Sequence, residues 1–189
     1  MPGPDYPWAT YLPGAIWQPR PGNAAIKAVV LHARHTQSPE QLAALRGDPA
    51  ASYHYLVTAS GGVVQFVPER GMTAALGRVV HNAPRDRFCI HVCLDGDAEQ
   101  LTWPDDQVAA VSHLLSVIVS VRGAMPVRDA ANLAAPRGRF AELSAWPWID
   151  MLRRVIRLDT PVERIYAAMI GEGPITAGEL YDAMQNDVP

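Results

Sequence analysis

Short runs of β-branched and aromatic residues alternate with capped helical segments, and this alternation constrains the fold more than any other feature. Strands are predicted at residues 26–32 (IKAVVLH), 53–59 (YHYLVTA), 63–67 (VVQFV) and 87–95 (RFCIHVCLD). Ser60, Gly61 and Gly62 predict a hairpin between the second and third strands, because glycine adopts the positive φ angles of tight turns. Strands that alternate with helices predict an α/β domain.

Capping signals place the helices of this domain. Residues 38–41 (SPEQ) hold an N-cap serine, a proline and a glutamine, which predict a short helix that ends at Gly47. Thr102 and Asp105 predict the start of a long helix that runs to about Arg122. A loop is expected over residues 124–144, followed by a helix over residues 148–158.

The two ends of the chain differ from its middle. Residues 1–25 combine six prolines with four tyrosines and tryptophans, which predicts an extended arm held to a surface by its aromatic rings. Residues 26–158 are expected to form the domain. Residues 159–189 contain two further capping patterns, so they are expected to form a helical C-terminal extension that docks on its own domain or on a neighbouring subunit.

Composition excludes several classes of protein. The chain has 189 residues, with 16 Lys and Arg against 19 Asp and Glu, so a net charge of −3 argues against nucleic acid as the main partner. The most apolar run, residues 108–121, is interrupted by polar residues, and no membrane span is expected. The N-terminus has no basic residue before Arg20 and predicts no signal peptide. Cys89 and Cys93 are expected to be reduced, buried thiols.

Several segments, taken in order, resemble the zinc-dependent N-acetylmuramoyl-L-alanine amidases, a family that includes T7-type lysozyme and the peptidoglycan recognition proteins. These segments are AIWQPRPGN, VVLH, ASYHYLVTASGGVVQFVPE, FCIHVCLDG and LTWPDDQVAAVSHLLSVI, and the resemblance covers roughly residues 14–150. It implies a mixed central β-sheet flanked by helices. It also implies a site with three zinc ligands and an open fourth position for water.

The matched positions predict a degenerate form of that site. His32 matches the first zinc ligand, whereas Val127 and Ala135 fall at the second and third, and neither side chain can bind zinc. Tyr53 matches a tyrosine that assists catalysis in several members. Other matched positions have also changed: Cys93 replaces a glutamate, His91 replaces a glycine, and Ala74 and Ala75 replace a Trp-His pair of the cleft wall. We therefore expect no bound zinc, and His32, Tyr53 and His91 remain candidates for a ligand groove.

Other histidines have simpler interpretations. A relocated metal site built from the remaining His and Cys side chains is a minor alternative. His54 is expected to bond to the backbone, and His113 to be a polar position in a helix. Because His32 is not expected to anchor a metal, the substitution His32→Ala is expected to leave stability nearly unchanged.

The retained framework and the altered site predict a non-catalytic domain. One hypothesis is a module that binds peptidoglycan fragments. A second is a structural protein in which the fold contacts other subunits of an assembly, such as a bacteriophage virion. An active zinc amidase that cleaves the bond between N-acetylmuramic acid and L-alanine is the alternative. The expected location is a phage virion or the cytoplasm.

Overall fold

A computed structural model of the chain describes residues 4–13, 17–21, 24–35, 41–42, 52–73, 75, 86–123, 125–132, 143 and 145–156. The predicted helix at residues 38–47 and the C-terminal extension lie almost entirely outside these ranges. Everything below concerns the described residues.

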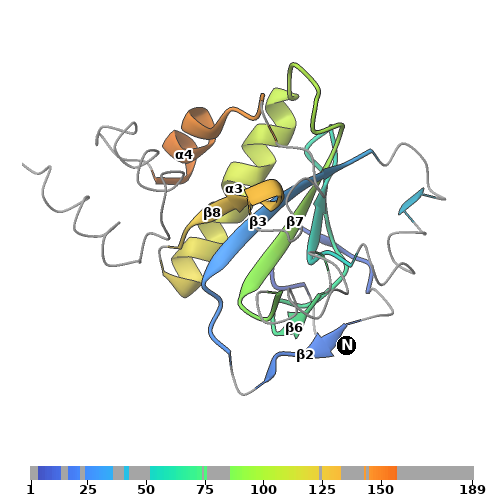
Figure 1. The fold of residues 1–189 in the computed structure, drawn as a ribbon, viewed down its shortest axis with the longest axis vertical. Coiled ribbons are helices and arrows are strands. Elements are labelled where there is room, and N and C mark those ends of the chain that lie inside the picture. Colours follow the sequence, from blue (N-terminus) through green and yellow to red (C-terminus); the bar gives the residue numbers. More distant parts are fainter. Residues whose placement is uncertain are drawn as a thin grey trace, which may run out of the picture.

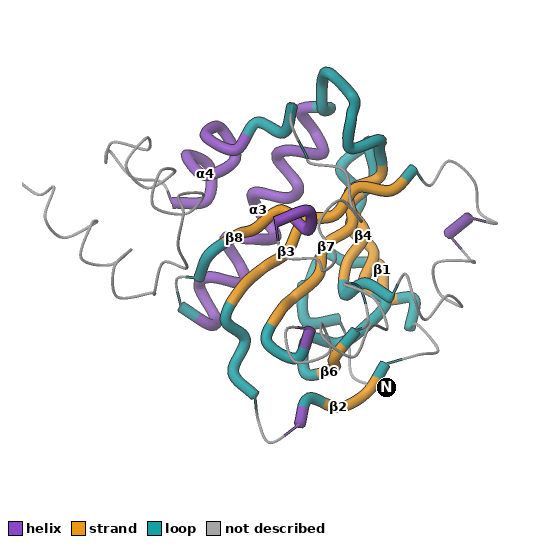
Figure 2. The backbone as a smooth tube through the Cα atoms, viewed as in Figure 1, coloured by secondary structure: helices purple, strands orange, loops and turns teal. Residues whose placement is uncertain are grey.

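A mixed β-sheet forms the centre of the molecule (Figures 1 and 2). Its six strands lie in the order β1-β5-β4-β7-β3-β8. Their bounds are Thr10–Tyr11 for β1, Ala28–Arg34 for β3, Tyr55–Val57 for β4, Val63–Gln65 for β5, Cys89–Asp95 for β7 and Val127–Asp129 for β8. β3 pairs in parallel with both β7 and β8, whereas β4 and β5 form the predicted antiparallel hairpin. The expected mixed sheet is therefore confirmed.

Two helices lie on one side of the sheet. α3 (Asp105–Arg122) runs behind the sheet in Figure 1, and α4 (Trp148–Ile156) packs against α3. A 3-10 helix, η3 (Ala130–Asn132), follows β8. None of the helices in the described ranges has the length and hydropathy needed to cross a membrane.

Alternation along the strands gives the sheet two different faces. The face toward α3 holds the main apolar core, which includes Val29, Leu31, Tyr55, Ile90, Val92, Leu94, Val108, Val111, Leu115, Ile118 and Met151. The opposite face, called the His32 face below, carries Val30, His32, Leu56, His91 and Cys93 from β3, β4 and β7. Cys89 and Cys93 are both buried and not bridged, as predicted.

The N-terminal arm also pairs as strands, in addition to the packing expected of its aromatic rings. Its segment β1 pairs in parallel with β5 at the sheet edge, and β2 (Gln18–Pro19) pairs with β6 (Gly71–Met72). Tyr6 is buried in the main core, whereas Trp8 is 66% exposed. The arm thus adds strands to the fold, which proline-rich composition does not predict.

Two local predictions were wrong. Pro104, not Thr102, is the residue that precedes α3, and no side-chain hydrogen bond caps this helix. Part of the expected loop at residues 124–144 forms β8 and η3. Asp129 stabilises this turn, because its carboxylate accepts hydrogen bonds from the backbone N–H groups of Ala131 (2.9 Å) and Leu143 (2.7 Å).

Candidate functional site

Three buried side chains lie in a row of close polar contacts on the His32 face. His32 Nε2 lies 2.9 Å from His91 Nδ1, and His91 Nε2 lies 3.0 Å from a carboxylate oxygen of Asp86. The exposed fractions are 2% for His32, 0% for His91 and 2% for Asp86. His32 and His91 come from neighbouring parallel strands, where the residue pairs Val30–His91 and His32–Cys93 are in register.

The contacts link the three side chains in one row. His91 Nε2 faces the Asp86 carboxylate, which accepts hydrogen bonds when it is ionised. His91 Nδ1 and His32 Nε2 share one hydrogen bond, and the tautomers of the two rings determine which nitrogen donates. Asp86 and His32 thus hold the His91 ring at both of its nitrogen atoms.

His54 supports the same cluster from the end of β4. Its Nδ1 accepts a hydrogen bond from the His91 backbone N–H (3.0 Å), and its Nε2 donates to the Gly71 carbonyl oxygen (3.1 Å). The two rings stack with centroids 5.9 Å apart. The expectation that His54 bonds to the backbone is confirmed, and the same bond holds the His91 segment in place.

Burial sets the charge state of this cluster. Desolvation lowers the pKa of His32 well below its ordinary value of 6.5, and the neighbouring His91 lowers it further. Burial likewise lowers the pKa of His54, with smaller contributions from His91 and the Arg20 guanidinium. Burial raises the pKa of the Cys93 thiol, so Cys93 is not a ready thiolate. At neutral pH the His32 face thus holds two uncharged imidazoles and a protonated thiol.

Tyr53 lies directly beside His32, and the two ring centroids are 5.1 Å apart in an edge-to-face arrangement. Tyr53 is 5% exposed and packs in an apolar cluster with Leu56, Phe66 and Cys93. The structure therefore brings together His32, Tyr53 and His91, the three predicted groove residues. Ala75 is buried in the same cluster, while Ala74 lies outside the described residues.

Strand β8 places the predicted second ligand position away from His32. Val127 pairs with Val29, and its side chain lies in the core between the sheet and α3. Arg128 pairs with Val30, so this residue, one position later, shares the His32 face. Valine has no donor atom, and an arginine side chain has no free lone pair to offer a metal. Ala135 lies outside the described residues.

The described residues do not fit a catalytic zinc centre. Such a centre needs three protein ligands, typically His, Cys, Asp or Glu. Within the described ranges, no three side chains of these types lie close enough together to hold a metal ion. His32, the matched first ligand, has its Nε2 bonded to His91.

Sequence reasoning missed Asp86 and Arg20. Arg20 donates hydrogen bonds to the carbonyl oxygens of Glu69 (2.8 Å) and Cys89 (2.7 Å), and it also bonds to the carbonyl of Arg87. It therefore joins the arm to the segment that presents Asp86 and to the start of β7. The sequence offers one signal for Asp86, which is a carboxylate five residues before a strand histidine. This spacing alone is not diagnostic of a functional site.

Comparisons with known proteins agree with this architecture. The chain is similar in fold to a selenomethionine derivative of AmpD, with 19% identity, a TM-score of 0.66, and coverage of 78% of this chain and 94% of that one. It is also similar to the Ph2119 endolysin of a Thermus scotoductus bacteriophage, with 19% identity, a TM-score of 0.57, and coverage of 74% and 89%.

A third similar structure is a variant of Drosophila PGRP-LB in complex with tracheal cytotoxin, with 15% identity, a TM-score of 0.52, and coverage of 75% and 91%. No curated protein sequence matches the chain. The family model described as N-acetylmuramoyl-L-alanine amidase matches residues 22–134, which is more than half of the chain. The chain therefore belongs to the N-acetylmuramoyl-L-alanine amidase family.

Proposed function

We propose that this amidase-family domain binds peptidoglycan fragments of the muramyl-peptide class without hydrolysing them. The observation that carries the proposal is the state of His32, whose Nε2 is bonded to the oriented imidazole of His91. Water bound to a catalytic zinc has a pKa near 7, whereas free water has a pKa of about 15.7. A site with one matched ligand lacks the means to make that nucleophile at neutral pH.

Binding does not need a metal. The Tyr53 hydroxyl and the imidazoles of the His32 face supply donors and acceptors of the kind that sugars and peptides use. Support also comes from the similar PGRP-LB structure, which holds tracheal cytotoxin. Because His32 and Tyr53 are 2% and 5% exposed, binding through these groups requires a rearrangement that exposes them.

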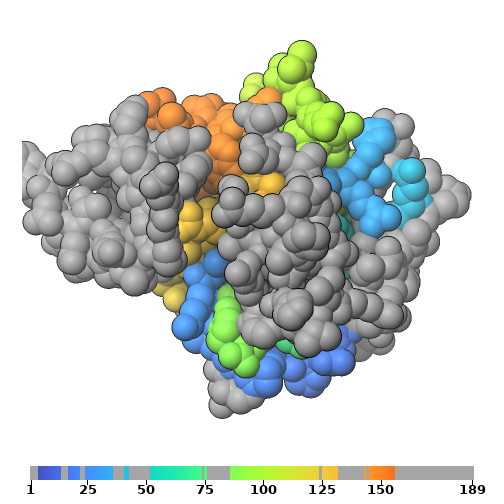
Figure 3. Space-filling view, in the orientation of Figure 1, coloured from blue at the N-terminus to red at the C-terminus, as the bar shows by residue number. Residues whose placement is uncertain are grey.

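A role as a structural module is a second candidate, and large exposed apolar side chains favour it. Leu101 is 89% exposed and Trp8 is 66% exposed. Leu101 belongs to the loop between β7 and α3, which protrudes at the top of the molecule in Figure 3. Such side chains suit contacts with other subunits. A place in a phage virion is part of this second proposal.

The test uses the full chain and muramyl dipeptide. Binding is measured by calorimetry, and cleavage of the lactyl amide bond by chromatography, with and without added Zn²⁺. We expect saturable binding that Tyr53→Phe weakens and Tyr11→Phe does not, with no cleavage product and no stoichiometric zinc in the purified protein. Zinc-dependent cleavage that His32→Ala abolishes would establish an active amidase, while absence of binding would overturn the binding role.

A further inference from the structure

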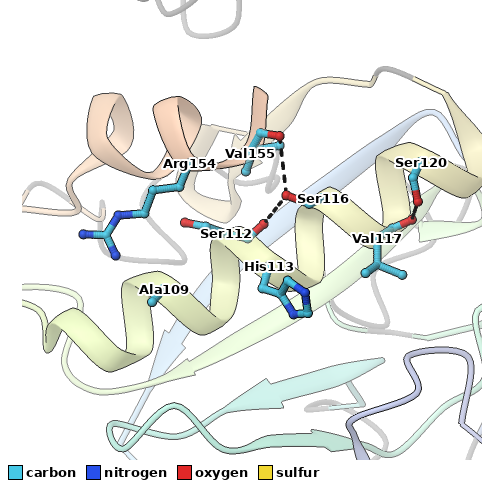
Figure 4. A pocket seen from close by; sticks show the side chains of 8 residues that line it. All are labelled: Ala109, Ser112, His113, Ser116, Val117, Ser120, Arg154 and Val155. Carbon is cyan, nitrogen blue, oxygen red and sulfur yellow. Dashed lines mark hydrogen bonds between the residues drawn. The ribbon is translucent and has the colours of Figure 1, made fainter. Parts of the chain in front are cut away.

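The side of α3 that faces away from the His32 cluster forms a groove with a volume of about 440 Å³ (Figure 4). Its lining residues are Ala109, Ser112, His113, Ser116, Val117 and Ser120 from α3, and Arg154 and Val155 from α4. The α3 positions recur at intervals of three and one residues, which makes one continuous stripe along the helix.

The floor of this groove consists largely of small side chains, and it offers few polar groups that are not already hydrogen-bonded. The Ser112 hydroxyl donates to the Val108 carbonyl oxygen at 2.7 Å, and Ser116 donates to the Ser112 carbonyl at 2.9 Å. Ser120 donates in the same way to Val117 at 2.8 Å. Because these hydroxyls are already bonded to the backbone of α3, the floor suits the close approach of an apolar helix face better than a polar small molecule.

Two walls border the stripe. One wall is the last turn of α4, where the Val155 carbonyl oxygen lies 3.4 Å from the Ser116 hydroxyl. The other is the N-terminal arm, because the Tyr6 hydroxyl lies 2.6 Å from His113 Nδ1 and the Trp8 ring centroid lies 4.8 Å from that of His113. The exposed face of Trp8 therefore stands at the edge of the groove.

We propose that residues 161–170 of this chain dock in the groove in cis, as an amphipathic helix laid along α3. Val155 lines the groove, and α4 ends one residue later, so the following segment of the sequence starts beside it. Residues 160–163 (TPVE) carry an N-cap threonine, a proline and a glutamate, which predict a helix start. The proposal does not depend on the proposed function.

The pattern and length of this segment match the groove. Apolar residues occur at i, i+3, i+4 and i+7, namely Val162, Ile165, Tyr166 and Met169. Ten helical residues span about 15 Å, and the twelve-residue stripe from Ala109 to Ser120 spans about 18 Å at the same rise per residue. A helix this short is unstable alone in water, so it needs a surface of this kind.

Tethering favours the cis arrangement. The docking segment, residues 161–170, is neutral overall, with Glu163 as its single carboxylate and Arg164 as its single cation. Arg154 is the charged side chain among the lining residues, and its only described ion pair is a long contact of 3.7 Å to Asp150. The four-residue tether 157–160 raises the effective concentration of the segment at the groove above that of any separate chain.

The test places a spin label at the groove edge of the full chain. Val121 is 73% exposed next to Ser120, and the two native cysteines are buried, so Val121→Cys can be labelled selectively with a nitroxide. We expect paramagnetic broadening of the backbone amide signals of residues 162–170. Ile165→Asp, on the apolar face, is expected to abolish the broadening, and the matched control Ala167→Asp, on the opposite face, to retain it.

A mixing experiment separates cis from trans docking. Spin-labelled chain without isotope is mixed with isotope-labelled chain without spin label, and the cis proposal predicts no broadening in the mixture. Broadening in the mixture would overturn it in favour of docking between copies. Absence of broadening in the singly labelled chain would overturn docking altogether, provided that the amide signals of β3 and β7 report a folded domain. Neither outcome depends on muramyl-peptide binding.

Discussion

Two buried histidines couple the stability of this chain to pH. The pKa values of His32 and His54 are lowered in the folded state, chiefly by burial, whereas the unfolded chain titrates near 6.5. Below that pH the unfolded state binds protons that the folded state does not, so acidification favours unfolding. The effect is absent above about pH 7.5, where both histidines are neutral in the folded and in the unfolded state.

We therefore predict that the free energy of unfolding falls by about 2 kcal/mol between pH 6.5 and pH 5.5, about 1 kcal/mol for each histidine. Urea denaturation at the two pH values measures the difference. His54→Gln is expected to remove about half of it. The control His35→Gln changes an exposed ring and should leave the difference intact. Equal stability of the native chain at both pH values would contradict this linkage.

The contacts of His32 lead to a different prediction from the nearly neutral effect expected for His32→Ala. The ring is buried, shares a hydrogen bond with His91 Nδ1 and packs on Tyr53. Alanine leaves the buried His91 nitrogen without its partner and creates a cavity, so we predict a loss of about 3 kcal/mol in unfolding free energy. His32→Gln keeps a donor and is expected to lose less. A loss below about 0.5 kcal/mol, typical of surface positions, would disprove this role.

The sequence predicted the candidate site in part. The resemblance to the amidase family pointed to His32, Tyr53 and His91, and these three side chains do lie together. It did not predict that His91 bonds to His32, since pairing between strands far apart in sequence depends on register. It did not reveal that Arg128 shares the His32 face in place of Val127, because a three-residue strand carries too short a pattern to set its phase.

At the level of elements, the hairpin of β4 and β5 was predictable because its turn chemistry is local. Gly61 has a φ of 81°, as the Gly-Gly signal implied. Strand β8 was not predictable, since its three residues follow a glycine and a proline in a stretch that is typical of a loop. The sequence analysis placed the residue before α3 at Thr102, which is two residues too early. Pro104 occupies this position, and no side-chain hydrogen bond caps the helix.

A substitution at Gly61 tests how the turn of the β4–β5 hairpin packs against α3. A Cβ atom at Gly61 would lie 2.9 Å from the Asp106 carbonyl oxygen in the first turn of α3. Gly61→Ala therefore adds a backbone clash to the cost of a positive φ, and we predict a loss of about 2 kcal/mol or more in chemical denaturation.

Gly123→Ala is the matched control for this prediction. Gly123 has a similar φ of 86°, but a Cβ atom there would meet nothing within 4 Å. Gly123→Ala should lose only the conformational part, about 1–3 kcal/mol, because the Gly123 backbone (φ 86°, ψ 170°) lies in a region that is almost restricted to glycine. Equal losses in the two variants would show that the hairpin does not depend on its contact with α3.

At the level of the whole molecule, the N-terminal arm is joined to the domain by partly buried hydrogen bonds. The Asp5 carboxylate accepts hydrogen bonds from the Gln65 side chain (2.5 Å) and from the Glu69 backbone N–H (2.8 Å). The Glu69 carboxylate in turn accepts a hydrogen bond from Tyr55 (2.8 Å) and pairs with Arg122 at the end of α3. The arm, the hairpin and α3 are thus joined by one polar network, although composition separates the arm from the domain.

Arg20 provides the strongest test of this connection. Its guanidinium donates to the backbone carbonyl oxygens of Glu69, Arg87 and Cys89, which come from both sides of the segment that carries Asp86. Arg20→Gln leaves some of these acceptors unpaired, and hydrogen bonds from charged donors contribute about 1.5–3 kcal/mol each, so we predict a loss of about 3 kcal/mol or more. The exposed Arg70→Gln should change stability by less than about 0.5 kcal/mol.

If Arg20→Gln also loosens the Asp86 segment, amide hydrogen exchange at His91 will accelerate relative to Ile90. Similar stability of the two variants would show that the arm is dispensable to the domain.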